Sequence, residues 1–219
     1  MRRVVTGMMT SLDGVMQAPG GPDEDPSGGF RFGGWVFPFW DQAGGEKWGE
    51  TFARPFELLL GRKTYEIFAA YWPHQDGAIA DPFNAATKYV ATSSTEPLAW
   101  ANSVRLEGEV IDAIARLKQG EGPDLLTQGS ATLVRSLLAA GLVDELLLLV
   151  FPVMLGKGKS WFGDDGKPGE WTLAESLVTT TGAYFGRYRP KGPIRTGSFA
   201  QTEPSADELK RRERWKKEG

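Results

Sequence analysis

Cysteine is absent from the 219-residue chain, and histidine occurs only once, at His74. The absence of cysteine excludes disulfides, thiolate metal sites and cysteine nucleophiles, and a single histidine excludes a multi-histidine metal site. His74 follows Tyr71-Trp72-Pro73 and is interpreted as a loop residue. We therefore expect no metal in the site.

Long apolar runs and a strong charge of either sign are also missing. No window is long and apolar enough to span a bilayer, and the opening Met-Arg-Arg-Val-Val is typical of a strand and not of a signal peptide. The formal net charge of −3 gives no general attraction to nucleic acid or to an anionic membrane. We expect a cytoplasmic protein whose partner is a small-molecule substrate.

The length suits one well-buried domain with at most an appendage. Apolar runs alternate with helical patterns as far as Val150, and residues 172–179 and 182–188 then pattern as an antiparallel hairpin. This order predicts an α/β sheet with an antiparallel edge. We place the domain at residues 1–190. The charged tail at 191–219 can form a short helix and is interpreted as a solvated or subunit-contact segment.

One stretch in the second half of the domain predicts a strand, a tight turn and a helix. Leu125 and Leu126 end an apolar run, Gln128-Gly129-Ser130 interrupts it, and apolar residues recur at helical spacing from Thr132 until Gly141. Such a turn directs backbone N–H groups and the positive end of a helix at one point, which suits a phosphate. The alternative is an ordinary βα loop in which glycine is present only because it can adopt the backbone angles of the turn.

A second turn of the same kind lies earlier in the chain. The apolar run 57–60 is broken by Gly61, and Arg62-Lys63-Thr64 begin a helical pattern. Two cations stand beside this turn, and Thr64 can cap the helix or donate to an anion. Two glycine turns at helix N-termini fit a ligand with several phosphates, and a dinucleotide is the simplest such ligand.

Three further stretches are candidates for the site. Asp13, at the end of the first strand, suits either chemistry or a plain turn. Ser93 and Ser94 end the strand at 88–92 and suit a ribose or a phosphate, although such hydroxyl clusters also form turns. The aromatics of residues 30–40 are expected to pack on the core for the most part, and the loop can act as a lid over a cleft.

Five motifs in order resemble the dihydrofolate reductase-like superfamily, in the branch of the riboflavin biosynthesis reductase C-terminal domain. They are Ser11-Leu-Asp-Gly14, Leu60-Gly-Arg-Lys-Thr-Tyr-Glu66, Lys88-Tyr-Val-Ala-Thr-Ser93, Gln128-Gly-Ser-Ala131 and Gly141-Leu-Val-Asp-Glu-Leu146 with Pro152-Val-Met-Leu-Gly-Lys-Gly158. The resemblance covers about residues 2–189. It implies a mixed, mainly parallel central sheet flanked by helices, a C-terminal antiparallel hairpin, an NADPH site and often a homodimer.

The resemblance also implies roles for individual residues. Gly61, Arg62, Lys63 and Thr64 match the turn that holds the cofactor phosphates. Ser93 and Ser94 match the strand end near the adenosine 2′-phosphate, and Gly129, Ser130 and Ala131 match the pyrophosphate turn. The guanidinium of Arg62 can grip the extra phosphate of NADPH by two bonds.

The catalytic side transfers poorly from the resemblance. Asp41, Glu46 and Glu50 occupy the helix that carries the pterin-binding carboxylate in dihydrofolate reductases, but none aligns with that carboxylate, and only Lys157 and Lys159 could grip a substrate phosphate. Asp13 is therefore our candidate for orienting the substrate or relaying a proton.

The sequence predicts an NADPH-dependent reductase that transfers hydride to a small flat heterocycle, pterin- or pyrimidine-like or of the riboflavin-pathway type. The alternatives are a non-catalytic NADPH-binding sensor or scaffold, and a structural dimer without cofactor. The fold hosts many chemistries and cannot choose the substrate.

Overall fold

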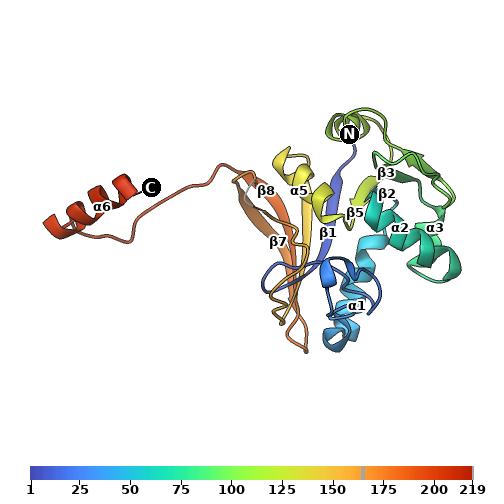
Figure 1. The fold of residues 1–219 in the computed structure, drawn as a ribbon, viewed down its shortest axis with the longest axis horizontal. Coiled ribbons are helices and arrows are strands. Elements are labelled where there is room, and N and C mark those ends of the chain that lie inside the picture. The colour runs from blue at the N-terminus through green and yellow to red at the C-terminus, as the bar shows by residue number, and fades with distance from the viewer. Residues whose placement is uncertain (164–165, 219) are drawn as a thin grey trace.

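The computed structural model describes residues 1–163 and 166–218, and its centre is an eight-stranded sheet (Figure 1). The strands lie in the order β4-β3-β2-β5-β1-β6-β8-β7. Six of them, from β4 to β6 in that order, run parallel, and β8 and β7 are antiparallel to their neighbours. The strand bounds are β1 Val4–Ser11, β2 Phe56–Gly61, β3 Lys88–Ala91, β4 Ser103–Arg105, β5 Asp124–Thr127, β6 Glu145–Phe151, β7 Glu170–Val178 and β8 Tyr184–Gly192.

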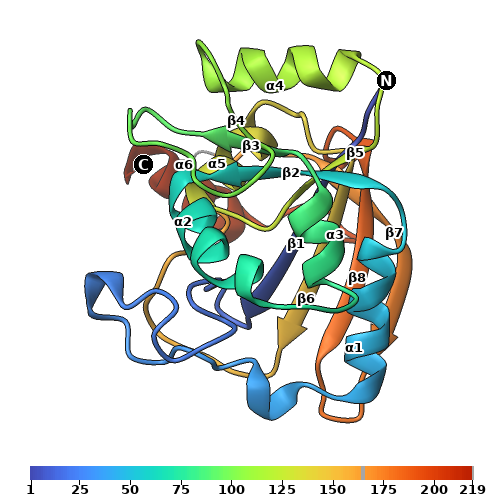
Figure 2. The same ribbon diagram turned by 90° about the vertical axis from the view of Figure 1, so that its right-hand side faces the viewer.

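Helices cover both faces of the sheet (Figure 2). Their bounds are α1 Gln42–Gly49, α2 Arg62–Tyr71, α3 Ala80–Ala85, α4 Val110–Gln119, α5 Ala131–Ala139 and α6 Ala206–Glu218, with 3₁₀ turns at η1 Ser27–Gly29, η2 Phe37–Phe39, η3 Glu50–Phe52 and η4 Trp72–His74. Side chains of α1, η3, α2 and α3 pack into one core with residues of the loop before α1, whereas α4 and α5 pack into a second core on the opposite face.

Strand side chains alternate between these two cores. Along β2, Leu58 and Leu60 join the first core and Leu59 joins the second, and all three are fully buried. Because both faces are covered, the central strands are almost continuously apolar, as parallel strands in α/β proteins usually are. The predicted mixed, mainly parallel sheet with its C-terminal antiparallel hairpin is confirmed.

Element boundaries differ from the sequence prediction in one place near the site. The α2 helix begins at Arg62, with Gly61 as its N-cap, so Thr64 lies inside the first turn and does not cap the helix. Gly61 has an extended backbone, as N-cap residues usually have, and no described side chain caps the first N–H groups of α2. Gly141 follows α5 with a positive φ of 67°, as expected after a helix end.

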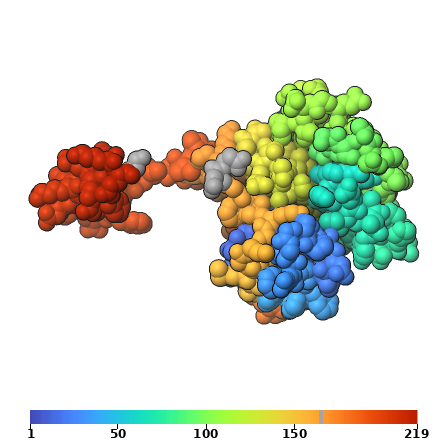
Figure 3. Space-filling view, viewed as in Figure 1, coloured from blue at the N-terminus to red at the C-terminus, as the bar shows by residue number. Residues whose placement is uncertain are grey.

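The C-terminal tail projects from the sheet domain (Figures 1 and 3). Helix α6 buries none of its residues, and the apolar side chains of Phe199, Leu209 and Trp215 are exposed. Asp207 and Glu208 lie in its first turn and Lys216 and Lys217 in its last, as the helix dipole favours. The homodimer expected from the resemblance stays a prediction.

None of the helices within the described ranges is both long and apolar enough to cross a membrane.

Candidate functional site

The two glycine turns predicted from the sequence touch each other at the carboxyl edge of the parallel strands. Strands β2 and β5 are neighbours, and the N–H of Gly61 after β2 donates to the carbonyl of Gly129 after β5 at 3.2 Å. A Cβ on Gly61 would lie 2.3 Å from the Ser130 hydroxyl, and one on Gly129 would lie 2.7 Å from the Thr64 hydroxyl. Glycine at both positions is therefore required for the two turns to approach each other.

Helices α2 and α5 begin directly after these turns. Gly61 is the N-cap of α2 and Ser130 the N-cap of α5, and within the described part of the chain no side chain caps the first N–H groups of either helix. Both helices thus present uncapped donors and the positive end of their dipoles at one edge of the sheet. The structure brings together the predicted residues Gly61, Thr64, Gly129 and Ser130 with Ala131, which begins α5.

Arg62 lies at the outer side of this edge, near the loop after β3. Its Nε donates to Glu66 Oε1 at 2.6 Å, and its NH1 lies 3.4 Å from the carbonyl oxygen of Glu96. Arg105, at the end of β4, also donates to the Glu96 carbonyl, at 2.8 Å, and to the carbonyl of Ser94. Two guanidinium groups therefore meet at the 94–96 turn, where Ser94 was predicted to bind phosphate.

Ser93 is exposed beside this turn, and the Ser94 hydroxyl accepts from the N–H of Glu96 at 3.2 Å. Sequence reasoning missed Arg105, because a single arginine at the end of a three-residue strand carries no local signal. Only the pairing of β3 with β4 shows that it lies next to the loop after β3.

Two connected hollows open between this edge and the first long loop. The inner hollow has a volume of about 120 Å³ and is lined by the start of α2 and α5, including Lys63, Thr64, Ser130 and Ala131. The outer hollow has a volume of about 790 Å³ and is walled mainly by apolar and aromatic side chains. The residues that line both are Met9, Pro19, Glu24, Trp48, Ile67, Phe68 and Gln128. Together they form one cleft, hereafter the carboxyl-edge cleft.

The lining of the cleft includes a buried polar group that has no partner among the described residues. The side-chain nitrogen of Gln128 is buried and makes no hydrogen bond within the described part of the chain. A buried unpaired donor is costly, and in a cleft it points to a ligand acceptor. Gly7 on β1 also lines the inner hollow. It lets the Trp48 ring lie close to the strand, because a Cβ on Gly7 would lie 3.0 Å from that ring.

Glu24 stands where the two hollows join. One oxygen of its carboxylate accepts from the N–H groups of Gly20, at 2.6 Å, and Gly21, at 3.2 Å. Burial raises the pKa of Glu24, and these two hydrogen bonds oppose the rise only in part. A carboxyl group that holds its proton to higher pH, in a cleft, is typical of an acid in catalysis.

Neighbouring Asp25 is bound to Lys159, whose Nζ lies 2.5 Å from Asp25 Oδ2 and which lines the inner hollow. Burial raises the pKa of Asp25, but the bonds from Lys159 and Ser27 outweigh burial and lower it. Lys159 is one of the two cations considered for a substrate phosphate. The other, Lys157, lines a separate surface hollow beside Phe30 and Phe32.

Asp13 is placed outside the cleft lining. Its carboxylate accepts from the Ser11 hydroxyl at 2.5 Å and from the N–H groups of Leu155 and Gly156 at 2.7–3.2 Å. The bond from Ser11, followed by the backbone donors, lowers the pKa of Asp13 although partial burial acts in the other direction. These contacts tie the end of β1 to the loop after β6. The catalytic role predicted for Asp13 stays a prediction.

The aromatic loop divides between the core and the cleft. Phe30 and Trp35 are buried, and Trp35 packs edge-on against Phe151, with 5.7 Å between the ring centroids. Phe37 and Trp40 line the outer hollow, and Phe37 is 84% exposed. Phe39 also packs against the core, but Phe32, Phe37 and Trp40 are exposed. Only half of the six aromatics therefore pack on the core, fewer than expected, and two border the cleft.

The strand order, the paired glycine turns and the C-terminal hairpin define a dihydrofolate reductase-like α/β protein. Residues 2–185 match the family described as the RibD C-terminal domain, and the chain belongs to that family. This membership supports a reductase-type function. The uncharacterised protein YyaP of Bacillus subtilis is 26% identical over 172 residues, which are 74% of this chain and 81% of YyaP.

Two solved structures share the fold. A protein from Shewanella sp. PV-4 assigned to riboflavin biosynthesis is 22% identical, with a TM-score of 0.60, over 87% of this chain and 99% of its own. Dihydrofolate reductase from Enterococcus faecalis, complexed with NADP(H) and RAB-propyl, is 15% identical, with a TM-score of 0.55, over 86% and 96%. At these identities the likeness shows the fold alone.

Proposed function

We propose that the chain is an NADPH-dependent reductase that transfers hydride to a small flat heterocycle. The observation that carries the proposal is the direct contact of the two glycine turns, which sets two uncapped helix N-termini side by side. Such an arrangement suits the pyrophosphate of a dinucleotide. When bound, NADPH supplies the hydride, and the protein supplies binding, orientation and a proton.

The residues present fit this cofactor. Gly61 and Gly129 leave a cradle that a Cβ would fill, and the buried nitrogen of Gln128 lacks an acceptor among the described residues. In the proposal, Thr64, Ser130 and Ala131 with Lys63 hold the pyrophosphate region. Arg62, with Ser93 and Ser94, holds the 2′-phosphate, and Arg105 positions the 94–96 turn.

The outer hollow is proposed as the substrate site. Its walls include Trp48, Phe52 and Phe68, whose rings suit a flat apolar face, and Glu24 offers a carboxyl group at its inner end. We propose that Glu24 orients the substrate and gives a proton to a ring nitrogen as hydride arrives at the adjacent carbon. Trp40 and Phe37 at the border would exclude water.

The first experiment is a titration of the chain with NADPH and, separately, with NADH, followed by energy transfer from the eight tryptophans. We expect micromolar binding of NADPH and much weaker binding of NADH. Oxidation of NADPH is then followed at its nicotinamide absorbance against pterins, pyrimidines and flavin precursors.

The three possible outcomes separate the competing functions. Binding with turnover of one substrate class supports the reductase. Tight NADPH binding without oxidation over the whole panel would favour a non-catalytic sensor or scaffold. Absence of binding for both nucleotides would remove the reductase and leave the fold intact.

A further inference from the structure

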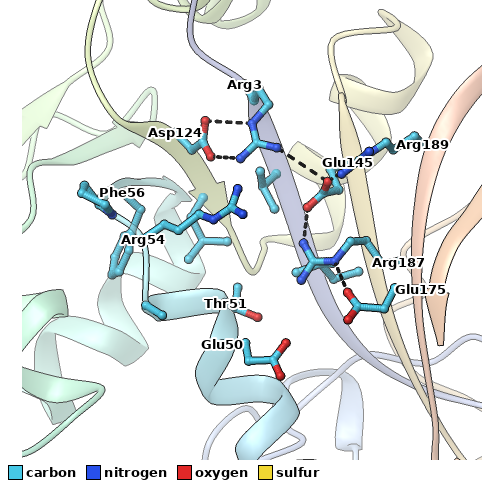
Figure 4. A pocket seen from close by; sticks show the side chains of 15 residues that line it. Arg3, Glu50, Thr51, Arg54, Phe56, Asp124, Glu145, Glu175, Arg187 and Arg189 are labelled. Atoms are coloured by element: carbon cyan, nitrogen blue, oxygen red, sulfur yellow. Dashed lines mark hydrogen bonds and ion pairs between the residues drawn. The ribbon is translucent and has the colours of Figure 1, made fainter. Parts of the chain in front are cut away.

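A second cavity lies at the opposite end of the sheet, where the parallel strands begin. Its volume is about 340 Å³, and its lining includes the apolar side chains of Val5, Leu126 and Leu147, hereafter its floor. Figure 4 shows this cavity from close by. The cavity is lined by residues near the start of β1, β5 and β6, whereas the glycine turns lie at the carboxyl ends of β2 and β5. We refer to this cavity as the arginine pocket.

The lining of the arginine pocket carries as many carboxylates as cations. The cations are Arg3, Arg54, Arg187 and Arg189, and the carboxylates are Glu50, Asp124, Glu145 and Glu175. Each of these carboxylates pairs with an arginine of the lining or with the adjacent Lys47, whereas Arg54 forms no ion pair with any described residue. An anion is therefore the ligand that the pocket favours.

Three of the arginines are organised by one buried carboxylate. Glu145 has a side chain that is 3% exposed and pairs with Arg187, with Arg189 at 3.1 Å and with Arg3 at 3.7 Å. Arg3 also binds Asp124 through two nitrogens, and Arg187 binds Glu175 at 3.0 Å. These pairs fix the far wall of the pocket (Figure 4). A fixed wall reduces the ordering cost of binding a ligand.

The near wall carries two polar groups that have no partner among the residues the structure describes. Thr51 lies in η3 and Arg54 follows the end of η3, and both line the pocket. Figure 4 shows the Arg54 side chain reaching into the pocket, and within residues 1–163 and 166–218 neither Arg54 nor the Thr51 hydroxyl has a side-chain hydrogen bond or ion pair. A guanidinium fork beside a hydroxyl matches the oxygens of a carboxylate or a phosphate.

We propose that the arginine pocket binds a small organic anion whose charged group is held by Arg54 and Thr51 and whose apolar body covers the floor of Val5, Leu126 and Leu147. The volume is at the lower end of the range for small-molecule sites, which extends from roughly 300 to 1,000 Å³. This site is distinct from the proposed cofactor and substrate sites and does not depend on either.

The same segment borders both sites. Trp48 and Phe52, in α1 and η3, line the carboxyl-edge cleft, while Thr51 and Arg54 line the arginine pocket. Ligand contacts at Thr51 and Arg54 therefore act on the helix that walls the proposed substrate site.

The test is calorimetric titration of the full chain with benzoate and with phenyl phosphate, using benzamide as the neutral analogue. We expect one site for at least one of the anions and no heat from benzamide up to about 10 mM. Arg54→Gln should weaken binding at least about tenfold, and Thr51→Val should weaken it less, since a charge-assisted fork contributes more than one hydroxyl. Arg116→Gln, which removes an exposed arginine from α4, should leave binding unchanged.

Three results would overturn the proposal. The first is no binding of either anion, and the second is equal binding by the Arg54→Gln and native chains. The third is loss of anion binding both when NADPH is added to the native chain and in the Arg62→Ala variant. The anion would then occupy the proposed cofactor site and not the arginine pocket. If ultracentrifugation shows a dimer that Arg54→Gln dissociates, and no anion binds, the pocket is an interface between copies. Failure of NADPH binding alone would refute the proposed function and leave this result standing.

Discussion

Replacement of Arg62 by alanine tests the nucleotide assignment directly. The Nε of Arg62 is bound to Glu66, and its NH1 has only a weak contact with the Glu96 carbonyl at 3.4 Å. Two terminal nitrogens are therefore able to reach a phosphate. NADH lacks the 2′-phosphate, so loss of the fork should affect NADPH selectively.

The size of the effect follows from these contacts. Each hydrogen bond to a charged group contributes about 1.5–3 kcal/mol, but the Arg62 side chain is 22% exposed, and water screens part of the interaction. We therefore expect a net loss of about 2–3 kcal/mol for NADPH, which is roughly a 30- to 150-fold increase in Kd. The Kd for NADH should change by less than about threefold.

The assay is fluorescence titration of native, Arg62→Ala and Arg62→Lys chains with both nucleotides. Lysine keeps the charge but cannot form a planar fork, so its effect should be intermediate. Arg116→Ala serves as the matched control for removal of a surface arginine. Equal losses for NADPH and NADH in Arg62→Ala would refute the 2′-phosphate assignment, whatever their absolute size.

Three further predictions concern catalysis, the glycine cradle and the core. Because burial raises the pKa of Glu24, activity that needs its proton should fall as pH rises through that pKa. Glu24→Gln should lower kcat by about 100-fold or more, remove this fall from the pH profile and leave the Kd of NADPH unchanged. An unchanged pH profile in this variant would exclude the role. Gly129 has a φ of 139°, and Gly129→Ala would place a Cβ 2.7 Å from the Thr64 hydroxyl, so it should weaken NADPH binding. The control is Gly108→Ala, because Gly108 also has a positive φ, of 76°, but has no neighbour within 4 Å, and its effect on NADPH binding should be smaller. Equal affinities of the two variants for NADPH would contradict the cradle. Burial lowers the pKa of Lys88 to about 8, so the unfolded chain binds more protons than the folded chain between pH 8 and 10.5. In chemical denaturation, the free energy of unfolding of the native chain should rise over this window by about 2 kcal/mol relative to that of Lys88→Met. Parallel plots of the free energy of unfolding against pH for the two chains would disprove the shift.

The pH window for Lys88 follows from the direction of the shift. A lowered pKa in the folded state means that the charged ammonium is disfavoured there, and this penalty is fully present below pH 8. The side chain is fully buried, but its Nζ donates to the carbonyls of Asn84, at 2.7 Å, and Ala101, at 3.1 Å. These bonds stabilise the charged form, which is why we expect less than the full value of the shift.

Local patterns were sufficient to predict most of the fold. The apolar runs at 57–60, 125–126 and 143–150 each contain part of a central strand, and Gly120 ends α4 as its C-cap. These features depend on residues adjacent in sequence, and both faces of the sheet are covered, so the strands could be recognised by apolar character alone. The order of the strands in the sheet was not predicted, because it depends on contacts between distant segments.

The site was predictable to the extent that its parts are local. Glycine turns before helices are visible in the sequence, whereas Glu24 lies in a Gly- and Pro-rich stretch whose composition indicates only a loop. Its importance arises from position: the loop places it between the inner hollow and the outer hollow. The buried Gln128 had a signal, since a polar side chain directly after a buried strand must find a partner.

Asp13 and Glu24 show how environment separates two carboxylates in the same region of the molecule. Asp13 accepts hydrogen bonds from a hydroxyl and two backbone N–H groups, and its pKa is lowered, so it stays ionised and holds the 155–156 loop against the end of β1. Glu24 has fewer donors and more burial, and its pKa is raised. An ionised, fully bonded carboxylate suits a structural tie, whereas a carboxyl group that retains its proton beside an apolar hollow suits proton transfer. Comparing Asp13→Asn with Glu24→Gln therefore separates the two roles: the first should lower thermal stability, and the second should change the pH profile at unchanged stability.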